Sequence, residues 1–243
     1  MKNYSNTYIF IYSSVMVIAV AAILSFVSMT LKPVQDKNIE VEKKMNILSS
    51  INIESTSDNA EELYDKYISE SYIVHFDGKS EKSITNEKGK ETFAFDIDLK
   101  KEFDKKQEEM NLPLFVAKMD DGSSNYIIPV RGKGLWGPIW GYVGLKEDMN
   151  TIFGVNFDHK SETPGLGAEI NTKNFQQQFF DKSIFDEQGN FVSVNVLKGG
   201  AAPDDIHGVD AISGGTITSV ALDKMLKDCL INYVPYFQNQ KNN

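Results

Sequence analysis

Residues 112–145 read LPLFVAKMDDGSSNYIIPVRGKGLWGPIWGYVGL, three apolar runs with turn residues between them. The first turn is Asp120-Asp121-Gly122-Ser123, and a glycine-rich segment separates the second run from the third. β-Branched and aromatic residues between such turns are typical of antiparallel hairpins. The segment therefore predicts the centre of a largely antiparallel sheet.

Shorter patterns on either side predict further elements. Strands are expected at residues 72–76, 92–99, 150–158 and 191–196, and helices at residues 59–69 and 172–180. Apolar residues at helical spacing predict a C-terminal amphipathic helix, with Thr218 or Ser219 as its N-cap: Leu222, Met225, Leu226, Cys229, Leu230 and Tyr233. Because strands and helices do not alternate regularly, we expect an α+β fold, not a doubly wound parallel sheet.

The N-terminal region contains an apolar run without a charged residue, from residue 7 to residue 31. The run exceeds the ~20 residues that a helix needs to cross a bilayer, so it predicts a transmembrane helix in contact with lipid. A cleaved signal peptide is the alternative, but the run is longer than an h-region. We expect a tail at 1–6, the span at 7–31, a juxtamembrane linker or helix at 32–55, and a folded domain at 56–243.

Composition excludes several classes of function. The net charge is −9 without a cluster of Lys and Arg, so we expect no nucleic-acid partner. Cys229 is the single cysteine, and the three histidines form no HExxH motif, so we expect no metal site. The chain also lacks a G-x-S-x-G elbow, and no G-x-G-x-x-G lies between a predicted strand and a predicted helix, as a dinucleotide-binding site would require. We therefore expect no catalytic residue of its own.

The strongest candidate for a binding site is the segment DAISGGTITS at 210–219, which leads into the predicted C-terminal helix. Gly214 and Gly215 permit close backbone approach, and a helix N-terminus favours an anion such as phosphate. The hydroxyl of Thr216 would hold a phosphate by hydrogen bonds or by an ester bond. An ordinary turn followed by a helix cap is the alternative.

Two other segments carry features of a ligand site. In ETPGLG at 162–167, Pro164 and Gly165 predict a rigid turn, and Glu162 and Thr163 offer polar groups. The segment PVRGKGLWGPIWGY at 129–142 contains both tryptophans of the chain. Their rings would pack on a flat ligand or fill a core beside tight turns.

Together these segments resemble a known family. Residues 210–216 resemble the flavinylation motif D-x-x-S-G-A-T, with Gly215 where the family usually has Ala. ETPGLG and the P-V-x-G-x-G-L-W-G-P-x-W-G-Y run resemble the NqrC family, the C subunits of Na+-translocating NADH:quinone oxidoreductases. The residues that we accordingly expect at an FMN site are Thr216, Asp210, Ser213, Gly214, Gly215, Glu162, Thr163, Pro164, Gly165, Leu166, Gly167, Trp136 and Trp140.

The resemblance implies that a flavin transferase attaches FMN to Thr216 as a phosphoester, reading Asp210 and Ser213 as part of its signature. It also implies an electron-relay subunit, anchored in the bacterial inner membrane by one span, with a periplasmic domain and with the other subunits of the complex as partners. That complex oxidises NADH, reduces quinone and pumps Na+. The alternatives are the G subunit of an Rnf-type complex and a membrane-tethered binding or assembly module without flavin.

Overall fold

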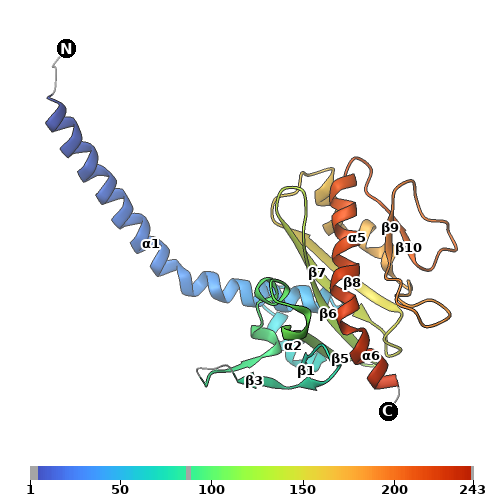
Figure 1. The fold of residues 1–243 in the computed structure, drawn as a ribbon. Helices are drawn as coiled ribbons and strands as arrows, with labels where there is room; N and C mark the ends of the chain where they lie inside the picture. The colour runs from blue at the N-terminus through green and yellow to red at the C-terminus, as the bar shows by residue number, and fades with distance from the viewer. Residues whose placement is uncertain (1–4, 86–88, 242–243) are drawn as a thin grey trace. The chain divides into compact units, whose positions relative to one another are not determined.

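A computed structural model describes residues 5–85 and 89–241 of the 243-residue chain. The chain divides into two compact units, one that ends at Lys43 and one that begins at Lys44. The first unit consists of most of helix α1 (Asn6–Ser49; Figure 1). The large apolar side chains in this part of the helix, from Tyr8 to Ile39, are exposed. Within the described residues, α1 is the one helix that is long and apolar enough to cross a membrane, which agrees with the predicted span.

The end of α1 belongs to the second unit. Ile47, Leu48 and Ile51 are fully buried, so this part of the predicted juxtamembrane region contributes to the core of the folded domain. The compact domain therefore begins at Lys44, before the boundary that we predicted at residue 55.

The second unit is built on a six-stranded sheet with the order β2-β1-β5-β6-β7-β8, in which every neighbouring pair is antiparallel. Its strands are β1 (Ile68–Val74), β2 (Ser80–Glu81), β5 (Leu112–Lys118), β6 (Ser124–Lys133), β7 (Pro138–Leu145) and β8 (Ile152–His159). Strands β5 to β7 are the three apolar runs of residues 112–145. The predicted α+β fold with an antiparallel sheet is confirmed.

Two small sheets and several short helices complete the domain. The small sheets pair β3 (Ser83–Thr85) with β4 (Glu91–Phe93), antiparallel, and β9 (Asn195–Leu197) with β10 (Gly208–Asp210), parallel. The α-helices are α2 (Ala60–Tyr67), α3 (Leu99–Phe103), α4 (Lys173–Gln176), α5 (Thr216–Leu230) and α6 (Val234–Lys241). The 3-10 helices are η1 (Ala94–Asp96), η2 (Gln107–Glu109), η3 (Gly167–Asn171), η4 (Gln177–Phe179) and η5 (Ile231–Tyr233).

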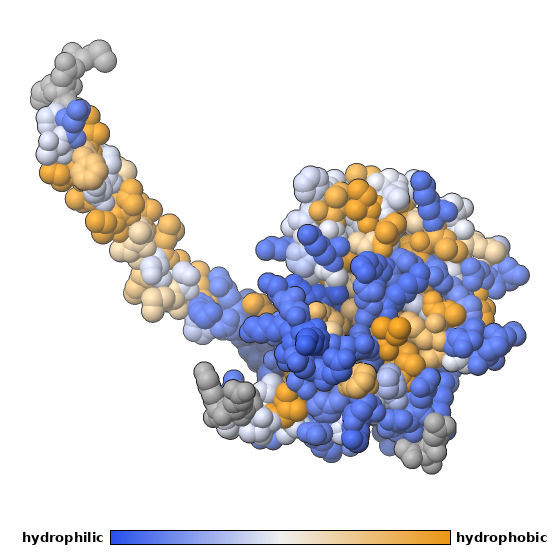
Figure 2. Space-filling view, in the orientation of Figure 1, coloured by the Kyte–Doolittle hydropathy of each residue, from blue (hydrophilic) through white to orange (hydrophobic). Residues whose placement is uncertain are grey.

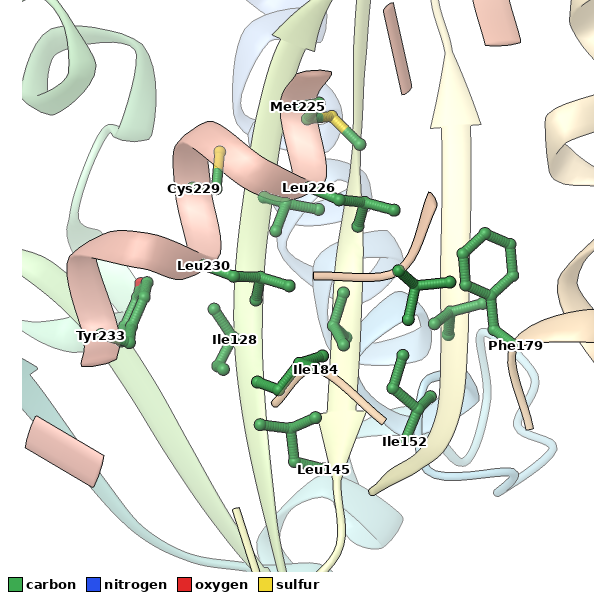
Figure 3. Close-up of a cluster of buried hydrophobic side chains, with 14 of the residues drawn as sticks. Ile128, Leu145, Ile152, Phe179, Ile184, Met225, Leu226, Cys229, Leu230 and Tyr233 are labelled. Atoms are coloured by element: carbon green, nitrogen blue, oxygen red, sulfur yellow. The ribbon is translucent and has the colours of Figure 1, made fainter. Parts of the chain in front are cut away.

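Each face of the large sheet is covered by a hydrophobic cluster. Helix α5 packs on β6, and its buried Leu226 and Leu230 belong to one cluster with Ile128 of the strand (Figure 3). The other face carries Phe115 and Ile127, which cluster with the buried end of α1. The apolar spacing of the C-terminal segment therefore serves packing on the sheet, as predicted, and Cys229 is a core residue.

Two predicted strands are largely wrong. A strand was expected at residues 92–99, but β4 ends at Phe93 and η1 follows. The buried side chains there are Ala94 and Ile97, three residues apart, which does not fit the two-residue repeat of a strand. Residues 191–196 form a strand only from Asn195, and Ser193 has a φ of 62°, which interrupts an extended chain.

Candidate functional site

Three segments that are distant in sequence line a cavity of about 220 Å³ at one end of the sheet. They are the turn between β6 and β7, the loop after β8, and the start of α5. Because β7 is antiparallel to both neighbours, the β6–β7 turn and the end of β8 lie at the same end of the sheet. The lining residues are Leu135, Glu162, Thr163, Leu166, Gly167, Gly214, Gly215, Thr216, Ile217 and Thr218.

Helix α5 begins at Thr216, two residues before the first of the N-caps that we predicted. Gly215 is the N-cap residue and supplies no side-chain hydrogen bond, whereas Thr216 is exposed at the first helical position. Thr218 and Ser219 are buried within the first turn. Their hydroxyls do not cap the helix, because each is engaged by another segment: Thr218 Oγ1 donates to Glu162, and Ser219 Oγ accepts from the backbone N–H of Ile212.

Glu162, in the loop after β8, forms hydrogen bonds to the other two segments. Its side chain is only 4% exposed, and its two carboxylate oxygens accept from different partners. Oε2 accepts from Thr218 Oγ1 at 2.6 Å, and Oε1 accepts from the backbone N–H of Trp136 at 2.9 Å. The carboxylate is therefore a buried part of the cavity wall, with both oxygens engaged by the protein.

Two glycines make room for this carboxylate. A Cβ on Gly134 would lie 2.6 Å from Glu162 Oε1, and a Cβ on Gly167 would overlap Thr218 Oγ1. Real Cβ atoms do not approach polar atoms so closely, so a side chain at either position would displace the carboxylate or the threonine.

The acceptor loop itself is shaped by Gly214, whose φ of +75° favours glycine. Leu166 lies against this loop, with its Cδ2 2.6 Å from where a Cβ of Gly214 would be. The predicted turn at Pro164-Gly165 is present: the backbone N–H groups of Leu166 and Ala168 both donate to the carbonyl oxygen of Thr163.

The three segments that meet at Thr216 carry exposed apolar side chains. Leu135, Trp136, Leu166, Ile217 and Val220 are between 41% and 66% exposed. Figure 2 shows apolar surface at the end of the domain where α5 begins. An exposed hydroxyl at a helix N-terminus is thus bordered by a small cavity and by apolar and aromatic groups, an arrangement suited to a ligand with a phosphate and a flat ring.

The structure brings together about half of the residues that sequence analysis placed at the site. Residues that do not line the cavity are Asp210, Ser213, Pro164, Gly165, Trp136 and Trp140. Trp136 is held next to it through its backbone. Trp140 follows Ile139, which packs in the α5 cluster, so Trp140 lies on the opposite face of the sheet.

Asp210 has a local structural role at the end of β10. Its Oδ1 accepts from the backbone N–H of Ala201 at 2.7 Å, and its own N–H donates to Gln178 Oε1 at 2.8 Å. Ser213 is exposed in the turn before α5. Sequence analysis missed Leu135 and Ile217 as lining residues and saw in Thr218 only a helix cap. Their proximity depends on how the β6–β7 turn and the loop after β8 meet α5.

Comparison with known proteins connects this cavity to a family. A family model described as the FMN-binding domain matches residues 134–231. The C subunit of the Na+-translocating NADH-quinone reductase of Haemophilus ducreyi is 32% identical over 220 residues, which cover 87% of this chain and 82% of that protein. The chain belongs to the NqrC family.

Solved structures of NqrC proteins have the same fold. The structure from Parabacteroides distasonis has a TM-score of 0.75 and 40% identity, covering 85% of this chain and 96% of that one. The structure from Shewanella oneidensis has a TM-score of 0.65 and 26% identity, covering 83% and 96%. Every residue that lines the cavity falls inside the FMN-binding match, so the cavity belongs to the part of the NqrC chain that this domain defines.

Proposed function

We propose that this chain is the electron-relay subunit of a Na+-translocating NADH-quinone reductase and carries FMN on Thr216 through a phosphoester. The observation that carries the proposal is the position of Thr216. Its side chain is exposed at the first residue of α5 and borders a cavity that lies within the FMN-binding match.

The start of α5 fits the phosphate of FMN. A helix of 15 residues concentrates partial positive charge at its N-terminus, where backbone N–H groups point outward. Gly215 has no side chain to occupy this position. A phosphate esterified to Thr216 is therefore stabilised by the helix, and its attachment prevents loss of the cofactor.

The cavity fits part of the flavin. Pockets that enclose a whole ligand measure about 300–1,000 Å³, whereas this one measures about 220 Å³. Part of the FMN therefore lies outside it, against the exposed Leu135, Trp136 and Leu166. When bound, the flavin supplies the redox chemistry, and the chain holds it where a neighbouring subunit can reach it.

Attachment requires a flavin transferase and FAD. The hydroxyl oxygen of Thr216 forms a bond to the phosphorus of the FMN half, the pyrophosphate bond of FAD breaks, AMP leaves, and the hydroxyl proton passes to a base of the transferase or to water. The exposed position of Thr216 leaves it accessible for this reaction. Asp210 and Ser213, both exposed, are part of the surface that the transferase reads.

The membrane part of the proposal follows from α1. We assign residues 7–31 to a single span in the bacterial inner membrane, residues 32–43 to the juxtamembrane segment, and the domain that begins at Lys44 to the periplasm. The span contains no ionisable residue that is charged at neutral pH, so Na+ translocation belongs to the assembled complex. Its partners are the other subunits and the surrounding lipid.

Membership of the NqrC family decides against the G subunit of an Rnf-type complex, because the relatives described above are C subunits of the Na+-translocating reductase. The remaining alternative is a membrane-tethered binding module. A tethered binding module would use the start of α5 without a flavin. Trp140 lies away from the cavity, so this proposal assigns it no contact with FMN.

The test is peptide mass spectrometry on the full chain co-expressed with an active flavin transferase. We expect an FMN-sized addition on the peptide that contains Thr216. Thr216→Ala should lose the addition, whereas Thr85→Ala, which removes an exposed threonine hydroxyl outside the motif, should still show labelling. The activity of the transferase is checked on a second substrate protein. If that protein is labelled and the native Thr216 peptide is not, the result contradicts the proposal and favours the binding module.

A further inference from the structure

The buried carboxylate of Glu162 connects two sides of the cavity. One oxygen accepts from Thr218, two residues after Thr216 in the first turn of α5. The other accepts from the backbone N–H of Trp136, whose side chain is exposed. A displacement of Glu162 would therefore move the attachment helix relative to the tryptophan.

This placement gives Glu162 partners within the protein as well as a position at the cavity. Glu162 is only 4% exposed, and each of its carboxylate oxygens accepts a hydrogen bond from the protein. Within the described residues, Glu162 forms no ion pair. Since a buried carboxylate is costly unless it is hydrogen-bonded, its two donors are required for its stability.

We propose that Glu162 is a positioning residue for FMN: its link to Thr218 and to Trp136 sets the distance between the attachment point and the exposed indole. The inference rests on the proposed function, because it concerns a flavin carried by Thr216. It adds that a buried residue of the cavity wall controls the orientation of the flavin through its hydrogen bonds to the rest of the protein.

The two hydrogen-bond partners of Glu162 hold different segments of the cavity in place. The hydroxyl of Thr218 holds the first turn of α5 in place, and Gly167 permits that hydroxyl to reach Glu162. The backbone bond to Trp136 holds the β6–β7 turn, and Gly134 permits the other oxygen to approach. The indole is therefore positioned through its main chain, and its ring remains available to a ligand.

The test compares Thr218→Val, which removes the hydroxyl at nearly constant shape, with Thr218→Ser, which retains it. Full chains are incubated with flavin transferase and FAD, and mass spectrometry gives the rate and final extent of labelling. Loss of a hydrogen bond to a buried carboxylate should lower the labelling rate roughly tenfold in Thr218→Val. Thr218→Ser should label at the native rate.

A second readout reports on flavin orientation after labelling. An indole stacked on a flavin quenches its fluorescence, so Trp136→Leu defines the signal without that contact. We expect the labelled fraction of Thr218→Val to approach the fluorescence of Trp136→Leu, and Thr218→Ser to remain quenched. Thermal unfolding without FMN measures general destabilisation separately.

Specific outcomes would overturn the inference. The inference is wrong if Thr218→Val shows the labelling rate and the fluorescence quenching of the native chain. It is also wrong if Thr218→Ser does not restore the native labelling rate and the native quenching, or if Trp136→Leu shows the fluorescence of the native chain. Should Thr218→Val not fold, Glu162→Gln is measured in the same way, because its amide nitrogen cannot accept one of the two hydrogen bonds. Absence of FMN on the native chain would instead contradict the proposed function itself.

Discussion

A single methyl group added to Gly134 should destabilise the domain, whereas the same change at Gly137 should not. Both glycines lie in the turn between β6 and β7, and neither has a positive φ, so the two variants differ in available space. A Cβ on Gly134 would lie 2.6 Å from Glu162 Oε1 and 2.9 Å from Cγ2 of Ile139. A Cβ on Gly137 would meet Ser161 Oγ at 3.3 Å, and that hydroxyl can rotate away.

The expected magnitude follows from two effects. Overpacking costs about 1–3 kcal/mol, and loss of the bond from Trp136 N–H to the buried carboxylate costs about 1.5–3 kcal/mol. The reduced entropy of the unfolded chain returns about 0.4–1 kcal/mol. We therefore expect a net loss of about 3 kcal/mol for Gly134→Ala, which corresponds to a fall in Tm of about 6–12 °C for a domain of this size.

The assay is thermal unfolding of the detergent-solubilised full chain without FMN, followed by near-ultraviolet circular dichroism. Gly137→Ala should unfold within about 3 °C of the native chain, since it makes one adjustable contact. Equal shifts in the two variants, or a native Tm for Gly134→Ala, would refute the view that the β6–β7 turn is packed on the Glu162 carboxylate.

Two further predictions concern α5. Gly215→Ala should lower the free energy of unfolding by about 1–3 kcal/mol, because its Cβ would lie 2.9 Å from Cγ2 of Ile212. Ile212→Leu, which removes the branch at Cβ, should recover at least half of this loss in urea unfolding; a double variant no more stable than Gly215→Ala would contradict the reasoning. Burial raises the pKa of the Cys229 thiol from 9.0 to about 12. The unfolded chain therefore releases this proton first, so its contribution to stability is intact below pH 9 and is lost as the pH rises toward 12. Cys229→Ala should show a smaller fall over that range, and identical pH profiles of urea unfolding would exclude the thiol as a cause.

The sequence predicted secondary structure correctly where apolar runs and turn residues of the same segment define it. The three strands of residues 112–145 combine apolar runs with recognisable turns, and the structure confirms both. The prediction for residues 92–99 failed because burial in η1 depends on packing in the cluster beneath the end of α1, where Ala94 and Ile97 lie. Thr218 and Ser219 were suitable caps by residue type, but their hydroxyls bond to other segments and α5 begins earlier.

The sequence by itself determined the apolar span, the antiparallel centre of the sheet, the glycine loop before α5 and the resemblance to the FMN-binding family. These properties are carried by composition, periodicity and contiguous motifs. Only the tertiary structure decided that Trp140 lies on the face opposite α5, and that Glu162 is buried between Trp136 and Thr218. Glu162 and Thr218 are 56 residues apart, so their contact depends on the strand register that places the end of β8 beside the start of α5.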